Sequence, residues 1–233
     1  KKTNLTVCSI FVNPTQFNNP DDFKNYPITI EKDIEKLIGG NCDVLFIPSV
    51  AEMYPPDHQK KQYKLGSLEM VLEGAHRPGH FQGVCEVVDR LLEMVQPDQL
   101  FMGQKDFQQC MVIARLLTLT GRNTKLVIQP TLRETDGLAM SSRNMRLTEA
   151  QRQQAVTISK ALFTIKDNFL PKTTAELEQE ASKQLTDAGF AIDYVSICHQ
   201  QTLLPLQTKT DPAVVLAAAT IGSVRLIDNM LLN

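Results

Sequence analysis

Residues 137–144 read G-L-A-M-S-S-R-N, so two adjacent hydroxyls and a guanidinium follow a small and flexible run. Ser141 and Ser142 can each donate one hydrogen bond, and the planar guanidinium of Arg143 can bind a phosphate through two. Short Ser-Ser-Arg runs also occur in surface loops that bind nothing. The run therefore indicates a phosphate site only if a second polar cluster supports it.

That second cluster is G-Q-K-D-F-Q-Q at residues 103–109. It follows an expected strand and opens an expected helix, where backbone N–H groups and the helix dipole face any anion and Lys105 adds a positive charge. The same residues also fit an ordinary turn with a solvated lysine, and they are not a Walker loop, which needs G-x-x-x-x-G-K-[ST]. The stretch alone favours neither interpretation.

Two glutamines could line the same crevice. Gln16 follows the first expected strand, and Gln109 lies one turn into the helix that opens near residue 106. A neutral amide both donates and accepts hydrogen bonds, which suits a substrate with hydroxyls and a carboxylate. An isolated glutamine is more often a surface group, so only the shared position at strand ends supports the pair.

Metal-binding features are weaker. His76 and His80 are four residues apart, but the Pro-Gly pair between them excludes the helix that would align both rings on a zinc ion. A loop histidine that assists an anionic substrate is one alternative, and a turn held by Pro-Gly is the other. Asp33 projects from an expected helix and could orient Mg²⁺, although such a carboxylate is usually just solvated.

The composition narrows the class of protein. The chain has 233 residues, 42% of them hydrophobic, and a formal net charge of -2. With no basic block and no tryptophan it shows no nucleic-acid footprint, and no apolar run approaches the roughly 18 residues of a membrane span. We find no signal peptide. The five cysteines are scattered without a C-x-x-C pair, which indicates a reducing, cytoplasmic compartment.

Apolar β-rich runs alternate with amphipathic stretches in the first 130 residues, which predicts an α/β fold with a parallel sheet. The strands of such a sheet end at one edge, where ligands bind. Beyond Pro130 two helices precede three strands, so we expect a smaller α+β domain. The expected strands span residues 5–12, 43–47, 99–102, 125–128, 190–198, 213–221 and 224–228. The expected helices span residues 29–38, 67–72, 84–95, 106–119, 148–167 and 173–189.

Capping residues mark several of these helix starts. Thr29 can cap the first helix, and two pairs, Thr148 with Gln151 and Thr173 with Glu176, have the spacing of capping boxes. The change of pattern near Pro130 leads us to divide the chain into residues 1–131 and 132–233.

Taken in order, these stretches resemble the pantoate-β-alanine ligase (pantothenate synthetase) family. The likeness covers residues 5–150, and R-L-I-D-N at residues 225–229 fits as well, whereas residues 150–220 are weakly diagnostic. The matching runs are V-N-P-T-Q-F at 12–17, Y-P at 26–27, M-Y-P at 53–55, H-F-Q-G-V at 80–84, G-Q-K-D-F-Q-Q at 103–109 and D-G-L-A-M-S-S-R-N at 136–144.

The resemblance implies a Rossmann-like domain of the nucleotidylyltransferase type, followed by an α+β lid domain, in a homodimer. It implies that pantoate and ATP form pantoyl adenylate and pyrophosphate, and that β-alanine then displaces AMP to give pantothenate. Mg²⁺ would bridge phosphate oxygens. Gln16 and Gln109 would hold pantoate, with Gln16 also near β-alanine. The ATP site would comprise Gly103, Gln104, Lys105, Asp106, Leu132 through its backbone, Met140, Ser141, Ser142 and Arg143. Lys105, Ser141, Ser142 and Arg143 would be the catalytic residues among them.

Two departures from the family pattern bear on activity. The family carries an H-x-G-H motif on a strand-turn-helix that the resemblance places ahead of residue 5, and Gln104 replaces a usual glutamate. We therefore expect a chain that begins at Lys1 to make little or no pantothenate. Another nucleotidylyltransferase, or a non-catalytic nucleotide-binding module, stays open as an alternative. A missing pantoate-dependent pyrophosphate exchange, or ATP binding without adenylate formation, would point to these.

Overall fold

The computed structural model describes residues 3–16 and 29–233, and every structural statement here refers to these residues. Strand β1 (Val7–Ser9) pairs in parallel with β2 (Val44–Phe46), and β3 (Gln99–Gly103) pairs in parallel with β4 (Lys125–Gln129). The described strands thus form two parallel pairs and not one continuous four-stranded sheet. Helices α2 (Ile30–Gly39) and α6 (Phe107–Thr120) connect the strands within the two pairs.

A long connection crosses from β2 to β3. It contains α3 (Val50–Met53), the 3-10 turn η2 (Gly66–Glu69), α4 (Glu73–His76) and α5 (His80–Val95). The short helix expected at 67–72 is this 3-10 turn. Another such turn, η1 (Pro14–Gln16), follows β1. No helix in the described part of the chain is long and apolar enough to cross a membrane.

Two local expectations for the first half are wrong in detail. The strand expected at residues 5–12 is only three residues long, because β1 pairs with the equally short β2. Leu5 lies outside this pairing and is 62% exposed. The Thr29 side chain makes no capping bond to the backbone of α2. Its hydroxyl instead lies 3.3 Å from a carboxylate oxygen of Asp33 and donates to it.

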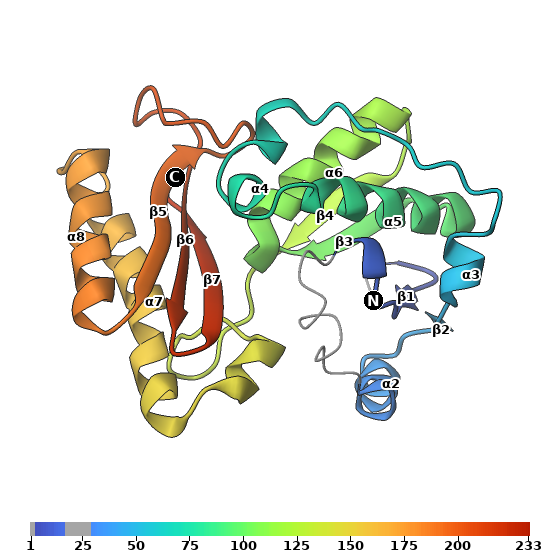
Figure 1. Ribbon diagram of the computed structural model, residues 1–233, viewed down its shortest axis with the longest axis horizontal. Helices are drawn as coiled ribbons and strands as arrows, with labels where there is room; N and C mark the ends of the chain where they lie inside the picture. Colours follow the sequence, from blue (N-terminus) through green and yellow to red (C-terminus); the bar gives the residue numbers. More distant parts are fainter. Residues whose placement is uncertain (1–2, 17–28) are drawn as a thin grey trace.

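The second half follows the expected order closely. The turn η4 (Ser142–Arg146) precedes α7 (Glu149–Asp167) and α8 (Thr174–Asp187), and both predicted capping boxes are present. An antiparallel sheet of order β5-β6-β7 follows, formed by Ala191–His199, Ala213–Ile221 and Val224–Leu231. The two helices cover one face of this sheet, and the first half of the chain lies on its other side (Figure 1).

Strand β6 is buried on both faces and contributes side chains to the apolar clusters of both halves of the chain. Val215 and Ala217 belong to the apolar cluster that α7 and α8 cover, whereas Val214 and Leu216 belong to a second cluster with the side chains of α5 and α6. Successive side chains of a strand point to opposite faces, so one strand can serve both clusters. The sheet is thereby pressed against the first half, with β7 beside the turn that follows β3.

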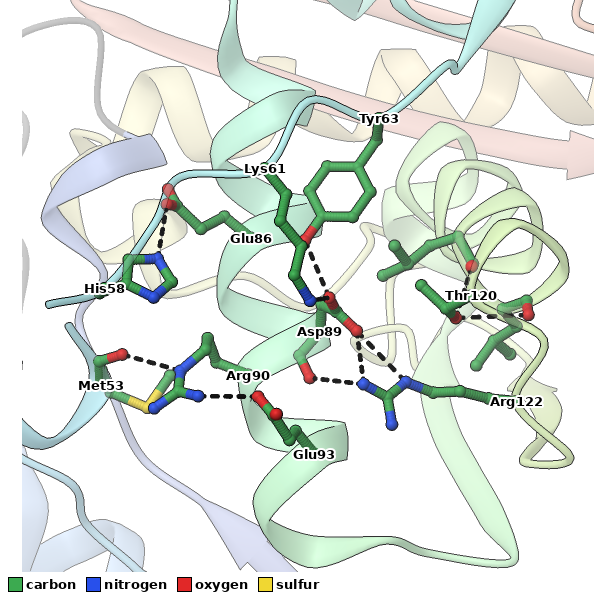
Figure 2. Close-up of polar contacts among 12 residues, drawn as sticks. Met53, His58, Lys61, Tyr63, Glu86, Asp89, Arg90, Glu93, Thr120 and Arg122 are labelled. Atoms are coloured by element: carbon green, nitrogen blue, oxygen red, sulfur yellow. Dashed lines mark hydrogen bonds and ion pairs between the residues drawn. The ribbon is translucent and has the colours of Figure 1, made fainter. Parts of the chain in front are cut away.

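A buried carboxylate fastens the long connection to the helices. Asp89 of α5, 2% exposed, accepts hydrogen bonds from Lys61 at 2.8 Å, from Tyr63 at 3.0 Å and from Arg122 at 2.6 Å (Figure 2). Burial raises the pKa of Asp89, but the bonds from Lys61 and Arg122 lower it by more, so the pKa lies below its usual range. The carboxylate is therefore charged at neutral pH and links three segments.

Candidate functional site

A cavity of about 480 Å³ lies where the turn after β3 faces strand β7. Its walls come from both halves of the chain: α4, α5 and α6 on one side, and η4, β5 and β7 on the other. Its position at the carboxyl end of a parallel strand agrees with the expectation for α/β ligand sites. Four of the residues expected at the ATP and pantoate sites line it, namely Lys105, Asp106, Gln109 and Arg143.

The turn after β3 leads directly into the N-terminus of α6. Strand β3 ends at Gly103, the 3-10 turn η3 spans Gln104–Asp106, and α6 begins at Phe107. The Cys110 thiol donates to the Gly103 carbonyl at 3.4 Å, and burial raises the pKa of this thiol to about 12, which keeps it protonated. The first N–H groups of α6 have no carbonyl partner within the helix and lie at this turn. Gly103 and Gln104 shape it without lining the cavity.

A small hairpin precedes the serine-arginine run. Arg133 and Ala139 form an antiparallel bridge, and the N–H of Met140 donates to the Leu132 carbonyl at 2.9 Å. At the turn Gly137 has a φ of 93°, a conformation that strains residues with a side chain. The hairpin therefore fixes the backbone at the start of the serine-arginine run. The side chains of Leu132 and Met140 are 74% and 50% exposed, so they leave an apolar surface beside the run.

The run itself is only partly gathered at the cavity. The Ser141 hydroxyl accepts a hydrogen bond from the N–H of Arg143 at 3.3 Å and starts η4. Lys105, Ser141 and Arg143 all line a void of about 10 Å³ that adjoins the cavity. Ser142 is exposed and lines neither space. Lys105, Ser141 and Arg143, three of the four residues expected to be catalytic, are thus brought together. Ser142, the fourth, lies outside this group.

One wall of the cavity is an ion-pair network that the sequence did not reveal. Arg225 of β7 donates to both carboxylate oxygens of Glu73, at 2.6 and 3.0 Å, and to Asp193 at 2.6 Å. The hydroxyl of Tyr194 donates to Glu73 at 2.8 Å. Burial raises the pKa of Glu73, but the bonds from Arg225 outweigh this, and the pKa lies below its usual range.

No local motif marks this network. Glu73 lies in the irregular connection, and Asp193 sits where the register of β5 shifts against β6 between Ile192 and Tyr194. Such a bulge redirects a side chain and often borders a functional site. A residue-type pattern cannot show this, because Glu73 is separated from Tyr194 and Arg225 by more than a hundred positions. The only signal for Arg225 was its place in the R-L-I-D-N run.

The histidine stretch also borders the cavity. His76 ends α4, Gly79 has a φ of 80°, and His80 begins α5, so the two histidines lie on separate helices. Arg77 and His80 are hydrogen-bonded at 3.1 Å, and all three polar residues line the cavity. Among the described residues no group of three or more His, Cys, Asp or Glu side chains could hold a metal ion. The hypothesis that His76 and His80 bind zinc together therefore has no support. Their position in the cavity lining fits the alternative that a loop histidine assists an anionic substrate.

The two neighbouring glutamines of α6 differ in role. Gln108 is 3% exposed and holds the connection before α4, because it donates to the carbonyls of Leu68 and Val71 at 2.9 Å each and accepts from the N–H of Glu73. Both residues line the cavity, but Gln109 has no such bonds within the described chain. This leaves its amide available for a ligand.

Two other sequence-predicted residues are not brought to this cavity. The side chain of Gln16 falls outside the described residues, as do Phe17 and the Y-P run at 26–27. Asp33 lies on α2, bonded to Thr29, and does not line the cavity. Its role as a magnesium ligand stays a prediction without support from the described residues.

The charged groups of the cavity lining fall into paired and unpaired sets. Among its described lining carboxylates, Glu73, Asp193 and Asp228 are each paired with an arginine. The cations Lys105 and Arg143 face the same space without an ion pair in the described chain. A site with spare positive charge and a neutral amide suits a nucleotide and a hydroxy acid.

Comparisons with known proteins identify the family of this chain. A family model described as pantoate-beta-alanine ligase matches residues 1–231. The pantothenate synthetase of Dehalococcoides mccartyi (strain CBDB1) is 41% identical over 232 residues, which are 97% of this chain and 85% of that protein.

Solved structures give the same result. The crystal structure of pantothenate synthetase from Thermus thermophilus superposes with a TM-score of 0.93 at 38% identity, over 98% of this chain and 84% of that one. A pantoate-beta-alanine ligase from Francisella tularensis, crystallised with β,γ-ATP and β-alanine, has a TM-score of 0.80 at 35% identity, over 99% and 80% of the two chains. With a family match along nearly its whole length and relatives well above 30% identity, this chain belongs to the pantoate-beta-alanine ligase family.

Proposed function

We propose that this chain joins pantoate to β-alanine, driven by cleavage of ATP to AMP and pyrophosphate, in the cavity between β3 and β7. By family membership the chain is a ligase. The observation that supports the assignment of this cavity most directly is that Lys105, Arg143 and Gln109 line it together. Two of them supply charge for phosphates, and the third supplies an amide for pantoate.

In the first step a pantoate carboxylate oxygen attacks the α-phosphorus of ATP, and the bond to the bridging oxygen breaks to release pyrophosphate. In the second step the β-alanine amine attacks the carbonyl carbon of the adenylate, loses a proton and expels AMP. Charge builds on phosphate oxygens in the first step. Fixed donors stabilise that charge best when they need not move, so Lys105, Ser141 and Arg143 act by electrostatic preorganisation.

Mg²⁺ would enter with ATP. An ion of this kind keeps phosphate and water oxygens as most of its ligands and needs one or two protein carboxylates. Asp106 fits this need, because it is the described carboxylate of the cavity lining without an arginine or lysine partner. When bound, the ion would neutralise charge on the triphosphate, while Lys105 and Arg143 orient the phosphates.

The residues proposed around the nucleotide are Gly103, Gln104, Lys105, Asp106, Leu132, Met140, Ser141, Ser142 and Arg143. Those proposed around pantoate are Gln16 and Gln109. A related ligase was crystallised with an ATP analogue and β-alanine, which supports a shared site for these molecules here. Leu132 is proposed to contribute through its backbone, and the exposed side chain of Met140 offers an apolar surface for the adenine ring.

The proposed function is tested by isotope exchange between pyrophosphate and ATP. In protein that also carries the family's H-x-G-H segment ahead of residue 5, we expect exchange that depends on pantoate, followed by formation of pantothenate and AMP only when β-alanine is added. Pantoate-independent exchange, or exchange supported by a different carboxylic acid alone, would instead indicate another nucleotidylyltransferase. ATP binding without exchange would indicate a nucleotide-binding module.

We predict that Gln109→Leu weakens pantoate binding by about 10- to 100-fold, since a leucine leaves polar groups of the substrate unpaired, a cost of about 1 to 3 kcal/mol. ATP affinity should change less than about threefold, and the helix should tolerate leucine. Calorimetric titration with each substrate measures both. An equal loss for the two substrates, or none for pantoate, would remove Gln109 from the pantoate site.

The neighbouring Gln108→Leu variant is the matched control. It should lower the melting temperature instead, because the carbonyls of Leu68 and Val71 and the N–H of Glu73 would lose their buried partner. The same substitution one residue apart thus separates a binding role from a folding role.

We also propose that residues 1–131 and 132–233 form two domains, with the second closing over the cavity as a lid. The protein would act in the cytoplasm, an environment that suits five unpaired cysteines. A homodimer is proposed from the resemblance to the family. Sedimentation equilibrium across a range of concentrations would measure the assembly state directly.

A further inference from the structure

Two consecutive buried residues of β7 contact both loops of the proposed nucleotide site. Asn229, 2% exposed, donates from Nδ2 to the carbonyls of Gln104 at 2.9 Å and Lys105 at 2.8 Å. Its Oδ1 accepts from Nε2 of Gln104 at 3.1 Å. Both the nitrogen and the oxygen of the Asn229 amide therefore bond to the turn that carries Lys105.

The preceding residue serves the other loop. Asp228, also 2% exposed, accepts from both ends of the Arg133 guanidinium at 2.7 and 3.0 Å. Arg133 in turn donates to the Gly137 carbonyl at 3.0 Å, inside the hairpin that leads to Ser141. A planar bidentate pair of this type fixes both distance and orientation. The second loop is thus fastened to the same strand.

The strand geometry explains why adjacent residues can do this. Successive side chains of a β-strand point to opposite faces, so Asn229 faces the turn after β3 while Asp228 faces the hairpin side. The two also share a bond, because the N–H of Asn229 donates to Oδ1 of Asp228 at 2.8 Å. A movement of either loop must therefore strain the same short segment of β7.

We propose that Asp228 and Asn229 are positioning residues that hold Lys105 and the Ser141-Arg143 loop at a fixed separation for phosphate binding. This inference rests on the proposed function. Donors that are already in place stabilise transition-state charge without reorganisation, and small displacements of such groups are costly in rate. Neither residue needs to touch the reacting atoms for this role.

The test uses Asn229→Asp, Asn229→Ala and Asp228→Asn in the full chain. The aspartate keeps the shape and the acceptor of Asn229 but turns a carboxylate oxygen toward the carbonyls of Gln104 and Lys105. We expect each Asn229 variant to lower the rate of pantoate-dependent pyrophosphate exchange at least 30-fold, mostly in kcat. Asp228→Asn should lower it at least tenfold.

Asn233→Ala is the matched control for a purely structural effect. Like Asn229, Asn233 donates to two backbone carbonyls, those of Lys209 and Asp211, and accepts one hydrogen bond, from the N–H of Ala213. None of these partners lines the cavity. Because Asn233 is exposed whereas Asn229 is buried, we expect this variant to lose less thermal stability than the Asn229 variants and to keep kcat within about threefold of the unmodified protein.

Hydrogen exchange gives a readout that is independent of catalysis. Amides of residues 103–110 should exchange faster in both Asn229 variants, and those of residues 134–140 faster in Asp228→Asn, with no change in Asn233→Ala. Rate losses no larger than that of the control, or unchanged protection in both loops, would overturn the proposal. If unmodified protein that carries the H-x-G-H segment shows no pantoate-dependent pyrophosphate exchange, the proposed function fails. Amide hydrogen exchange alone then decides whether β7 holds the loops.

Discussion

Lys105→Ala and Arg143→Ala should each slow adenylate formation by about 10²- to 10³-fold in the active ligase, on the order of 3 to 4 kcal/mol of transition-state stabilisation. Both cations line the cavity, and neither has an ion-pair partner in the described chain, so their charge is free to act on phosphates. Pantoate-dependent pyrophosphate exchange measures the step directly. The fold should survive, since neither side chain is buried.

The loss should appear largely in kcat, because charge grows on the phosphates between bound ATP and the transition state. Lys125→Ala is a suitable control, since this exposed lysine begins the neighbouring strand β4, at the end opposite the cavity. It should leave exchange within about twofold of the unmodified protein. Exchange at the unmodified rate in both Lys105→Ala and Arg143→Ala would show that the phosphates bind elsewhere.

Asp89→Ala should destabilise the protein by about 3 kcal/mol without touching the cavity. Removing one partner of a buried ionic cluster leaves the others with unpaired charge, which typically costs about 3 to 5 kcal/mol. The value here should fall at the low end, since the side chains of Lys61 and Arg122 are 56% and 24% exposed and can regain water. Urea denaturation followed by circular dichroism measures the free energy of unfolding.

Glu93→Ala on the same helix is the control. Glu93 pairs with Arg90 at 2.7 Å but is 53% exposed, and such surface pairs contribute less than about 1 kcal/mol (Figure 2). Asp89→Asn should fall between the two, because the amide keeps the shape and some hydrogen bonds but not the charge. If Asp89→Ala cost no more than Glu93→Ala, the cluster would have no role in anchoring the connection between β2 and β3.

The local sequence determined most of the secondary structure. The capping boxes at Thr148 and Thr173 start α7 and α8 where they were expected, and Gly121 ends α6 with a φ of 62°. These signals succeed because a cap or a left-handed glycine involves only residues within one turn. The same locality explains why the turn after β3 and the run of Ser141, Ser142 and Arg143 could be proposed as anion sites from the sequence.

Weak local signals failed where packing dominates. Residues 5–12 have the apolar composition of a buried strand, yet only Val7–Ser9 pair, because strand length depends on the partner strand as well as on the run itself. The choice between Gln108 and Gln109 likewise depends on the rotation of α6 against η2 and α4. Adjacent identical residues look alike in a sequence. Both line the cavity, but the amide of Gln108 is used in buried hydrogen bonds, whereas that of Gln109 makes none within the described chain.

The composition of the site was decided by the tertiary structure. Glu73 meets Arg225 across 152 positions, and Gln104 meets Asn229 across 125, only because β6 is buried on both faces and presses β7 against the end of β3. A motif records which residues can bind phosphate, since that capacity resides in each side chain. Their separation and orientation come from the packing of the apolar cores, which is a property of the whole chain.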